Sequence, residues 1–339
     1  MRRRYDDDYR GWPVAPRNRQ HPVRGSFLDP RTKENYHHGI DVSVRDDRPA
    51  SGAPPGRTHR VYALEGGQIW QVGPRNRRTG ESIVRLGHFG YGHVDPVVTQ
   101  GQTVRAGDML GWTFEGQWHL HLTEWVFPDG DRERRIPVDP LDRRGKIRPY
   151  VDTAKPVVID VRFFTPVISR WRVGNGRAVF VPAGQELDRT ALSGVVDVRA
   201  RIEDQQSFLG FWEELWRLET WHHPSRVRLK IVRLDDGDVV VDREVFRTEV
   251  TLDTEGPSPV GFSQHFAPGT KQNLRAPTAI ELRRQGRGEL WFRLFAATGG
   301  EPYWDTTTVP NGSYRLRITA WDVAGNRGQA TVDVTVANR

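Results

Sequence analysis

Three short segments lie close together in the sequence: Val61-Tyr62-Ala63-Leu64, Gly67-Gln68-Ile69-Trp70-Gln71-Val72 and Ser82-Ile83-Val84-Arg85-Leu86. They read as short strands rich in β-branched and aromatic residues, and glycines interrupt the chain between them. Val104, Met109-Leu110-Gly111 and His119-Leu120-His121-Leu122 continue this pattern, and no helical period separates them. The pattern predicts an all-β fold made of short strands.

A polar tract marked by prolines follows these strands. It begins at Pro128-Asp129-Gly130 and continues to Lys155-Pro156, which is typical of a domain end and a linker. The chain has 339 residues, and a single hydrophobic core rarely grows beyond roughly 250 residues. We therefore predict two domains, residues 1–150 and residues 151–339, and we expect a fragment of residues 1–150 to fold alone.

The second domain repeats the period of two. Apolar residues alternate with polar ones over residues 157–164, 195–202, 227–232, 313–321 and 330–336, a spacing that favours a β-sandwich. One stretch departs from this pattern, because Phe208, Phe211, Trp212, Leu215 and Trp216 follow a helical period. They predict a short helix near residues 208–219.

Composition excludes several classes of protein and of site. The chain has no cysteine, so disulfides, thiolate zinc sites and cysteine nucleophiles are excluded, and a metal has only His, Asp or Glu to bind. No apolar run is long enough for a transmembrane segment or for a visible signal peptide; either a signal has been removed or there is none.

The charge balance of the first domain indicates the kind of partner to expect. Residues 1–150 hold 25 Lys and Arg against 19 Asp and Glu, a balance that favours an anionic partner. No basic run exceeds three residues, so nucleic acid is not the expected partner.

The histidines of the first domain carry the chemistry. Six of its eight histidines occur as His37-His38-Gly39-Ile40-Asp41, then His88 and His93, then His119-Leu120-His121. Two histidines at i and i+2 of a strand point to the same face, and Gly39 permits a tight backbone path between His37 and Asp41. Three protein ligands with one open position define a catalytic zinc site.

This order of residues resembles the lysostaphin-like (LytM-type) zinc endopeptidases, which cut peptidoglycan cross-bridges. His-x-Gly-x-Asp is followed some 80 residues later by His-x-His. Three further segments are similar to parts of that family: Trp12-Pro13-Val14, Gly101-Gln102-Thr103-Val104-Arg105-Ala106-Gly107-Asp108-Met109-Leu110-Gly111 and Pro137-Val138-Asp139-Pro140-Leu141. The resemblance covers residues 12–142.

The resemblance implies a role for each residue of the motif. His37, Asp41 and His121 are the expected Zn²⁺ ligands. His119 and His88 are the expected catalytic pair, which activates water and stabilises the oxyanion. Two positions depart from the family: Leu86 replaces an aromatic two residues before the middle histidine, and Thr123 replaces a glutamate two residues after His-x-His.

The other histidines are expected to have no role in the site. His93 follows Tyr91-Gly92 in what reads as a loop, and His38 has the wrong spacing for a ligand. We expect the same of the remaining ones: His21, His59, His222, His223 and His265.

The second domain has a resemblance of its own. Residues 310–326, which include Asp322-Val323-Ala324-Gly325-Asn326, look like the last hairpin of bacterial immunoglobulin-like modules. The resemblance of the first domain implies a peptidoglycan peptide hydrolase that works outside the cell or in the cell envelope, in the periplasm or the wall.

Two alternatives stay open. One is a non-catalytic protein of the same fold that binds the cell wall or activates a hydrolase. The other is a surface or filament subunit. The sequence leaves the oligomeric state open.

Overall fold

The computed structural model confirms an all-β fold. The structure describes residues 9–31, 35–44, 49–166, 172–174, 177–179, 184–207, 221–248, 265–267, 270, 289–295 and 303–339. These residues form 23 strands, together with the 3₁₀ helices Pro128–Gly130 and Thr306–Thr308. The helix predicted near residues 208–219 lies outside the described residues.

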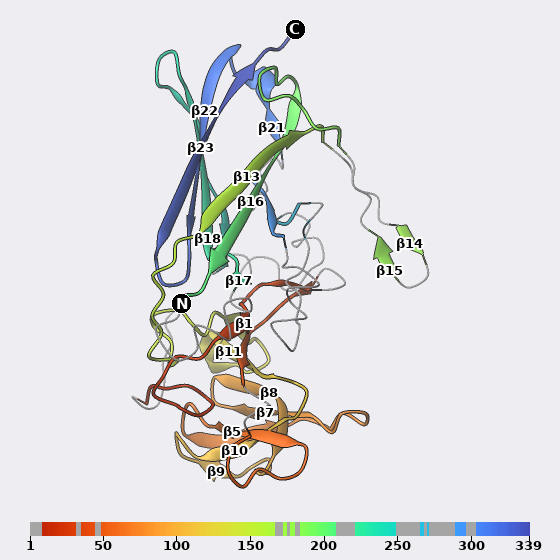
Figure 1. Ribbon diagram of the computed structural model, residues 1–339, viewed down its shortest axis with the longest axis vertical. Coiled ribbons are helices and arrows are strands. Elements are labelled where there is room, and N and C mark those ends of the chain that lie inside the picture. Colours follow the sequence, from red (N-terminus) through yellow and green to blue (C-terminus); the bar gives the residue numbers. More distant parts are fainter. Residues whose placement is uncertain are drawn as a thin grey trace.

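The first sheet has ten strands and lies at one end of the molecule (Figure 1). Seven of them follow the order β1-β4-β11-β8-β7-β6-β9: Val23–Gly25, Ile40–Ser43, His119–Val126, Phe89–Pro96, Ser82–Leu86, Gly67–Val72 and Thr103–Val104. β5 (Arg57–Tyr62) pairs with β10 (Met109–Phe114), β10 pairs with β8, and β12 (Ile136–Val138) pairs with β11. A separate two-stranded sheet joins β2 (Pro30–Arg31) to β3 (Asn35–Tyr36).

The strand β11 shows why the predicted alternation holds. Leu120 and Leu122 are fully buried in the core, and the residues between them point to the opposite face. That face receives His119 and His121. β11 lies between β4 and β8, so its histidines stand near the middle of the sheet order.

The second half forms two larger antiparallel sheets at the other end of the molecule (Figure 1). One contains β13, β16, β17, β20 and β21: Val157–Phe164, Val195–Gln205, Trp221–His222, Trp291–Arg293 and Trp304–Asp305. The other has the order β19-β18-β22-β23: Val239–Arg247, Arg226–Arg233, Gly312–Trp321 and Arg327–Val336. A short pair joins β14 (Arg172–Gly174) to β15 (Arg177–Val179). All five segments predicted from their period of two are strands.

The two halves meet through hydrogen bonds to the backbone of β1. The N–H of Val23 donates to Oε1 of Gln206 over 3.0 Å, and Nε2–H of His222 donates to the carbonyl of Val23 over 2.9 Å. All three residues are buried, and β17 lies beside β1 (Figure 1). Residues of the second half therefore satisfy both backbone polar groups of one residue in the first sheet. The prediction that residues 1–150 form an independent domain stays a prediction.

Removal of the second half is expected to loosen β1. A fragment of residues 1–150 lacks Gln206 and His222, so both backbone groups of Val23 lose their partners. We expect faster hydrogen exchange at the Val23 amide in the fragment than in the full chain, with little change at Val84 in the interior of the sheet. Hydrogen exchange read by NMR or mass spectrometry measures the difference. Equal protection of Val23 in the two proteins would show that these hydrogen bonds do not hold β1.

Candidate metal centre

Antiparallel pairing of β4 with β11 brings Asp41 directly opposite His121. His37 precedes β4, and Gly39 lies between the two. A Cβ atom at position 39 would stand 2.3 Å from the carbonyl oxygen of Leu122, a distance that no side chain can accept. The glycine therefore lets the segment from His37 to Asp41 lie against β11, so that three side chains from two strands converge.

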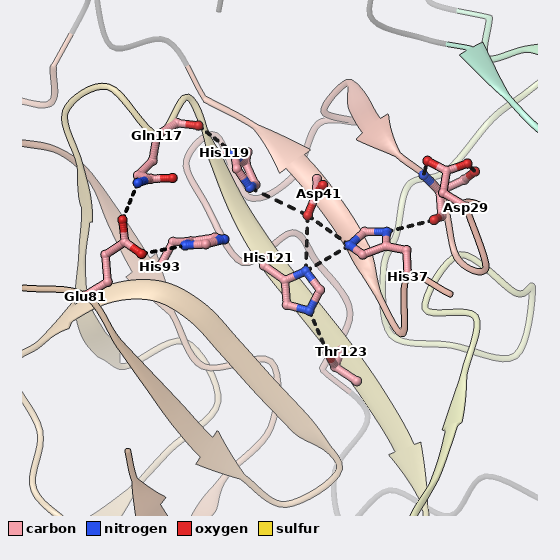
Figure 2. Close-up of polar contacts among 10 residues, drawn as sticks. Asp29, His37, Asp41, Glu81, His93, Gln117, His119, His121 and Thr123 are labelled. Carbon is pink, nitrogen blue, oxygen red and sulfur yellow. Dashed lines mark hydrogen bonds and ion pairs between the residues drawn. The ribbon is translucent and has the colours of Figure 1, made fainter. Parts of the chain in front are cut away.

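The converging atoms are Nε2 of His37, Oδ1 of Asp41 and Nδ1 of His121 (Figure 2). The two nitrogens are 2.9 Å apart, and each lies 3.1 Å from the carboxylate oxygen. Ligands held about 2.0–2.2 Å from zinc in a tetrahedron are separated by about 3.3 Å. The spacing of the three atoms therefore fits a metal ion of that size.

The rings of His37 and His121 each make a hydrogen bond through the nitrogen that faces away from the converging atoms. These bonds leave the lone pair of each ring on the nitrogen that faces the candidate metal position. Nδ1–H of His37 donates to the carbonyl of Ser26 over 2.8 Å, which leaves Nε2 of the neutral ring as the lone-pair atom. Nε2 of His121 lies 3.0 Å from the hydroxyl of Thr123, and donation by Nε2–H there leaves the lone pair on Nδ1. Such outer partners orient metal-binding imidazoles.

Asp41 is the charged member of the group and is fully buried. Burial alone would raise the pKa of its carboxyl group. The neighbouring His37, His119 and His121 instead hold that pKa well below its usual range. The carboxylate is therefore ionised, as a metal ligand must be.

Thr123, which replaces the expected glutamate, contacts the ring of His121 through its hydroxyl group. We expect Thr123→Val, which keeps the shape of the side chain and removes its hydroxyl, to weaken metal binding about 10-fold, because His121 loses the partner that fixes its ring. Competition with a chromogenic chelator measures the affinity. Thr123→Ser keeps the hydroxyl and should restore most of the binding. A valine variant with unchanged affinity would remove Thr123 from this role.

His119 lies next to the group, on the same face of β11. Its Nδ1–H donates to the carbonyl of Gln117 over 2.5 Å, and its Nε2 lies 3.7 Å from Oδ1 of Asp41. Within the described residues, this Nε2 makes no hydrogen bond. Burial lowers the pKa of His119 to about 3, so the ring is neutral at pH 7 and presents a lone pair toward the site.

His93 is the residue that sequence reasoning missed. It lies in β8, so its assignment to a loop is wrong. Ser82 pairs with Val94 and Ile83 with Gly92, so His93 is an extra residue in the strand, with φ of 61°. Such a β-bulge re-aims a side chain, and the ring lies edge-on to His119, with ring centroids 4.7 Å apart.

The ring of His93 is held by a carboxylate. Its Nδ1 lies 2.9 Å from Oε2 of Glu81, and the side-chain amide of Gln117 donates to the other oxygen of Glu81 (Figure 2). A signal for His93 was present in the sequence, because Tyr91 stands two residues before it. That is the position where the resemblance expects an aromatic residue, and His88 has Leu86 there.

The structure does not bring His88 to this group. The carbonyl of His88 accepts from the N–H of Trp125, four residues beyond His121 on β11, which corresponds to about 13 Å at ~3.3 Å per residue. Its Nδ1 lies 3.1 Å from Oε2 of Glu65, and its ring lies against Phe127. Of the five predicted site residues, the structure therefore brings together His37, Asp41, His119 and His121.

Comparison with models of known protein families gives no match, and comparison with functionally described proteins gives none either. Among solved structures, the chain is similar to CbpA from L. salivarius REN, at 21% sequence identity. The alignment covers 40% of this chain and 93% of that chain, with a TM-score of 0.27. A likeness at this level carries no inference about function. Within the described residues, no helix has the length and apolar character needed to span a membrane.

Proposed function

We propose that this protein is a LytM-type zinc endopeptidase that hydrolyses peptide bonds of bacterial peptidoglycan. The observation that carries the proposal is the convergence of His37, Asp41 and His121, with two more histidine rings beside them. The sequence order of these residues matches the family that the motif resembles. The proposal places the protein outside the cell or in the cell envelope, where peptidoglycan is found.

The donor set favours zinc among the common metals. Two imidazole nitrogens and one carboxylate oxygen make up a ligand set that catalytic zinc sites use, whereas magnesium and calcium prefer oxygen ligands alone. His37, Asp41 and His121 would hold the ion. When bound, zinc supplies Lewis acidity, which polarises a peptide carbonyl and acidifies a water molecule.

The two neighbouring histidines supply proton transfer and charge stabilisation. His119 is neutral and its Nε2 faces the site, so it is placed to take a proton from the attacking water and return it to the leaving amine. Nδ1 of His93 lies 2.9 Å from Oε2 of Glu81, and its ring lies edge-on to His119 beside the converging atoms, where a ring N–H would donate to the oxyanion. We therefore propose His93 for the role that the family resemblance implied for His88.

Metal analysis combined with digestion tests this function. The zinc content of the purified chain is measured by inductively coupled plasma mass spectrometry. The chain is also incubated with purified peptidoglycan, and the released fragments are identified by mass. We expect one equivalent of zinc and new amino termini, both lost in His121→Ala. A metal-free protein that binds peptidoglycan without cutting it would instead support a wall-binding or hydrolase-activating protein. Large assemblies in light scattering would support a surface or filament subunit.

A further inference from the structure

The face of the first sheet that carries the metal centre continues along β11. His121 and Thr123 are followed two residues later by Trp125, and side chains at alternate positions share a face. The opposing residues of β8 on that face are Gly92 and Gly90. A Cβ atom at Gly90 would stand 2.4 Å from the ring of Trp125, so this ring lies over the glycine. Trp125 is about 13 Å from His121 along the strand, at ~3.3 Å per residue.

Two tryptophans and three arginines form a cluster at this position. The rings of Trp70 and Trp125 are 6.3 Å apart. The guanidinium of Arg85, on β7, lies 5.5 Å from the first ring and 5.6 Å from the second. Arg132 lies 5.4 Å from the ring of Trp70, and Arg135 lies 5.8 Å from the ring of Trp125. We call these five residues the Arg–Trp cluster.

The cluster has more positive than negative charge. Within the described residues, Arg85, Arg132 and Arg135 have no acidic side chain at ion-pair distance, and Nε of Arg85 is buried without a hydrogen bond. Burial and the nearby Arg135 both lower the pKa of Arg85, while Glu133 acts in the opposite direction. Arg85 donates one N–H to Oε1 of Gln71. Three cations beside one face of the sheet are thus arranged for an anion.

We propose that the Arg–Trp cluster is a substrate subsite that binds a carboxylate of the peptide strand whose scissile bond lies at the metal centre. Arginine presents a planar fork of donors that matches a carboxylate, and the two indole rings hold the guanidinium groups in place through cation–π contacts. An extended peptide spans the 13 Å from His121 with about four residues. The inference rests on the proposed function and names the charge that its substrate carries.

Binding to peptidoglycan sacculi tests the subsite with the full-length protein. Cosedimentation is measured with untreated sacculi, with sacculi whose carboxylates have been amidated, and with sacculi from which hydrogen fluoride has removed phosphodiester polymers. We expect amidation to weaken binding about 10-fold, because charge-assisted hydrogen bonds are lost, and hydrogen fluoride to change it little. Binding that is lost after hydrogen fluoride and kept after amidation would overturn the proposal, since phosphate would then be the ligand.

Variants assign the effect to the cluster. Arg85→Gln combined with Arg132→Gln and Arg135→Gln should weaken binding about 10-fold and leave the zinc content unchanged. The matched control replaces Arg77, Arg78 and Arg105 by Gln, which removes the same charge from exposed positions in the same half. An equal loss of binding in the two triple variants would overturn the subsite, because the net positive charge of this half would then explain the binding. A wild type that shows the expected binding pattern without hydrolysis would contradict the proposed function and leave the subsite supported.

Discussion

His37→Ala, Asp41→Ala and His121→Ala are each expected to abolish stoichiometric zinc binding and peptidoglycan hydrolysis together. Each variant removes one of three converging atoms that lie within 3.1 Å of one another. Two remaining ligands hold zinc far more weakly than three. Without bound zinc, the protein lacks the Lewis acid that polarises the peptide carbonyl and acidifies water. Zinc content after dialysis and the release of soluble fragments from peptidoglycan are measured on the same sample.

The matched control for this series is His59→Ala, because His59 is a half-buried histidine of β5 outside the metal centre. It should keep one equivalent of zinc and full activity. Circular dichroism and thermal unfolding separate loss of the site from loss of the fold, which matters most for Asp41 because it is fully buried. If one of the three variants kept full zinc content and turnover, the residue that it replaces would not be a zinc ligand.

His119→Ala and His93→Ala are expected to keep zinc and to lose hydrolysis by about 10² to 10⁴ in rate, the usual range for removal of a proton-transfer group or an oxyanion donor. Neither side chain belongs to the three converging atoms, so the ion keeps its ligands. The rate of fragment release under saturating peptidoglycan measures the loss, and zinc content is measured in parallel. Loss of zinc in His119→Ala would mean that the two histidines of His-x-His have exchanged roles.

His88→Ala decides between the two middle histidines. Its ring pairs with Glu65 about four residues along the sheet from His121, so the variant should keep activity within a few-fold of wild type if His93 has the catalytic role. Activity lost in His88→Ala and kept in His93→Ala would restore the original assignment of His88 and contradict the role proposed for His93.

Much of the fold could be predicted because strands leave a period of two in the sequence. Leu120 and Leu122 alternate with His119 and His121, and burial of the leucines fixes which face the histidines occupy. The five segments of the second half were predicted for the same reason. The pairing of strands that are distant in the chain, such as β4 with β11, leaves no such local signal.

The sequence by itself determined the all-β class, and its resemblance to a zinc peptidase family indicated the group that could bind a metal ion. The spacing of His37, Gly39 and Asp41 and the i, i+2 spacing in β11 are local features, and each restricts where a side chain can point. Only the tertiary structure decided which further histidine joins them. One extra residue at His93, with its positive φ, turns that ring toward His119, and the pairing of Trp125 with His88 places the other ring far along the sheet. A bulge and a register depend on which strands pair, and pairing is set by the packing of the whole sheet.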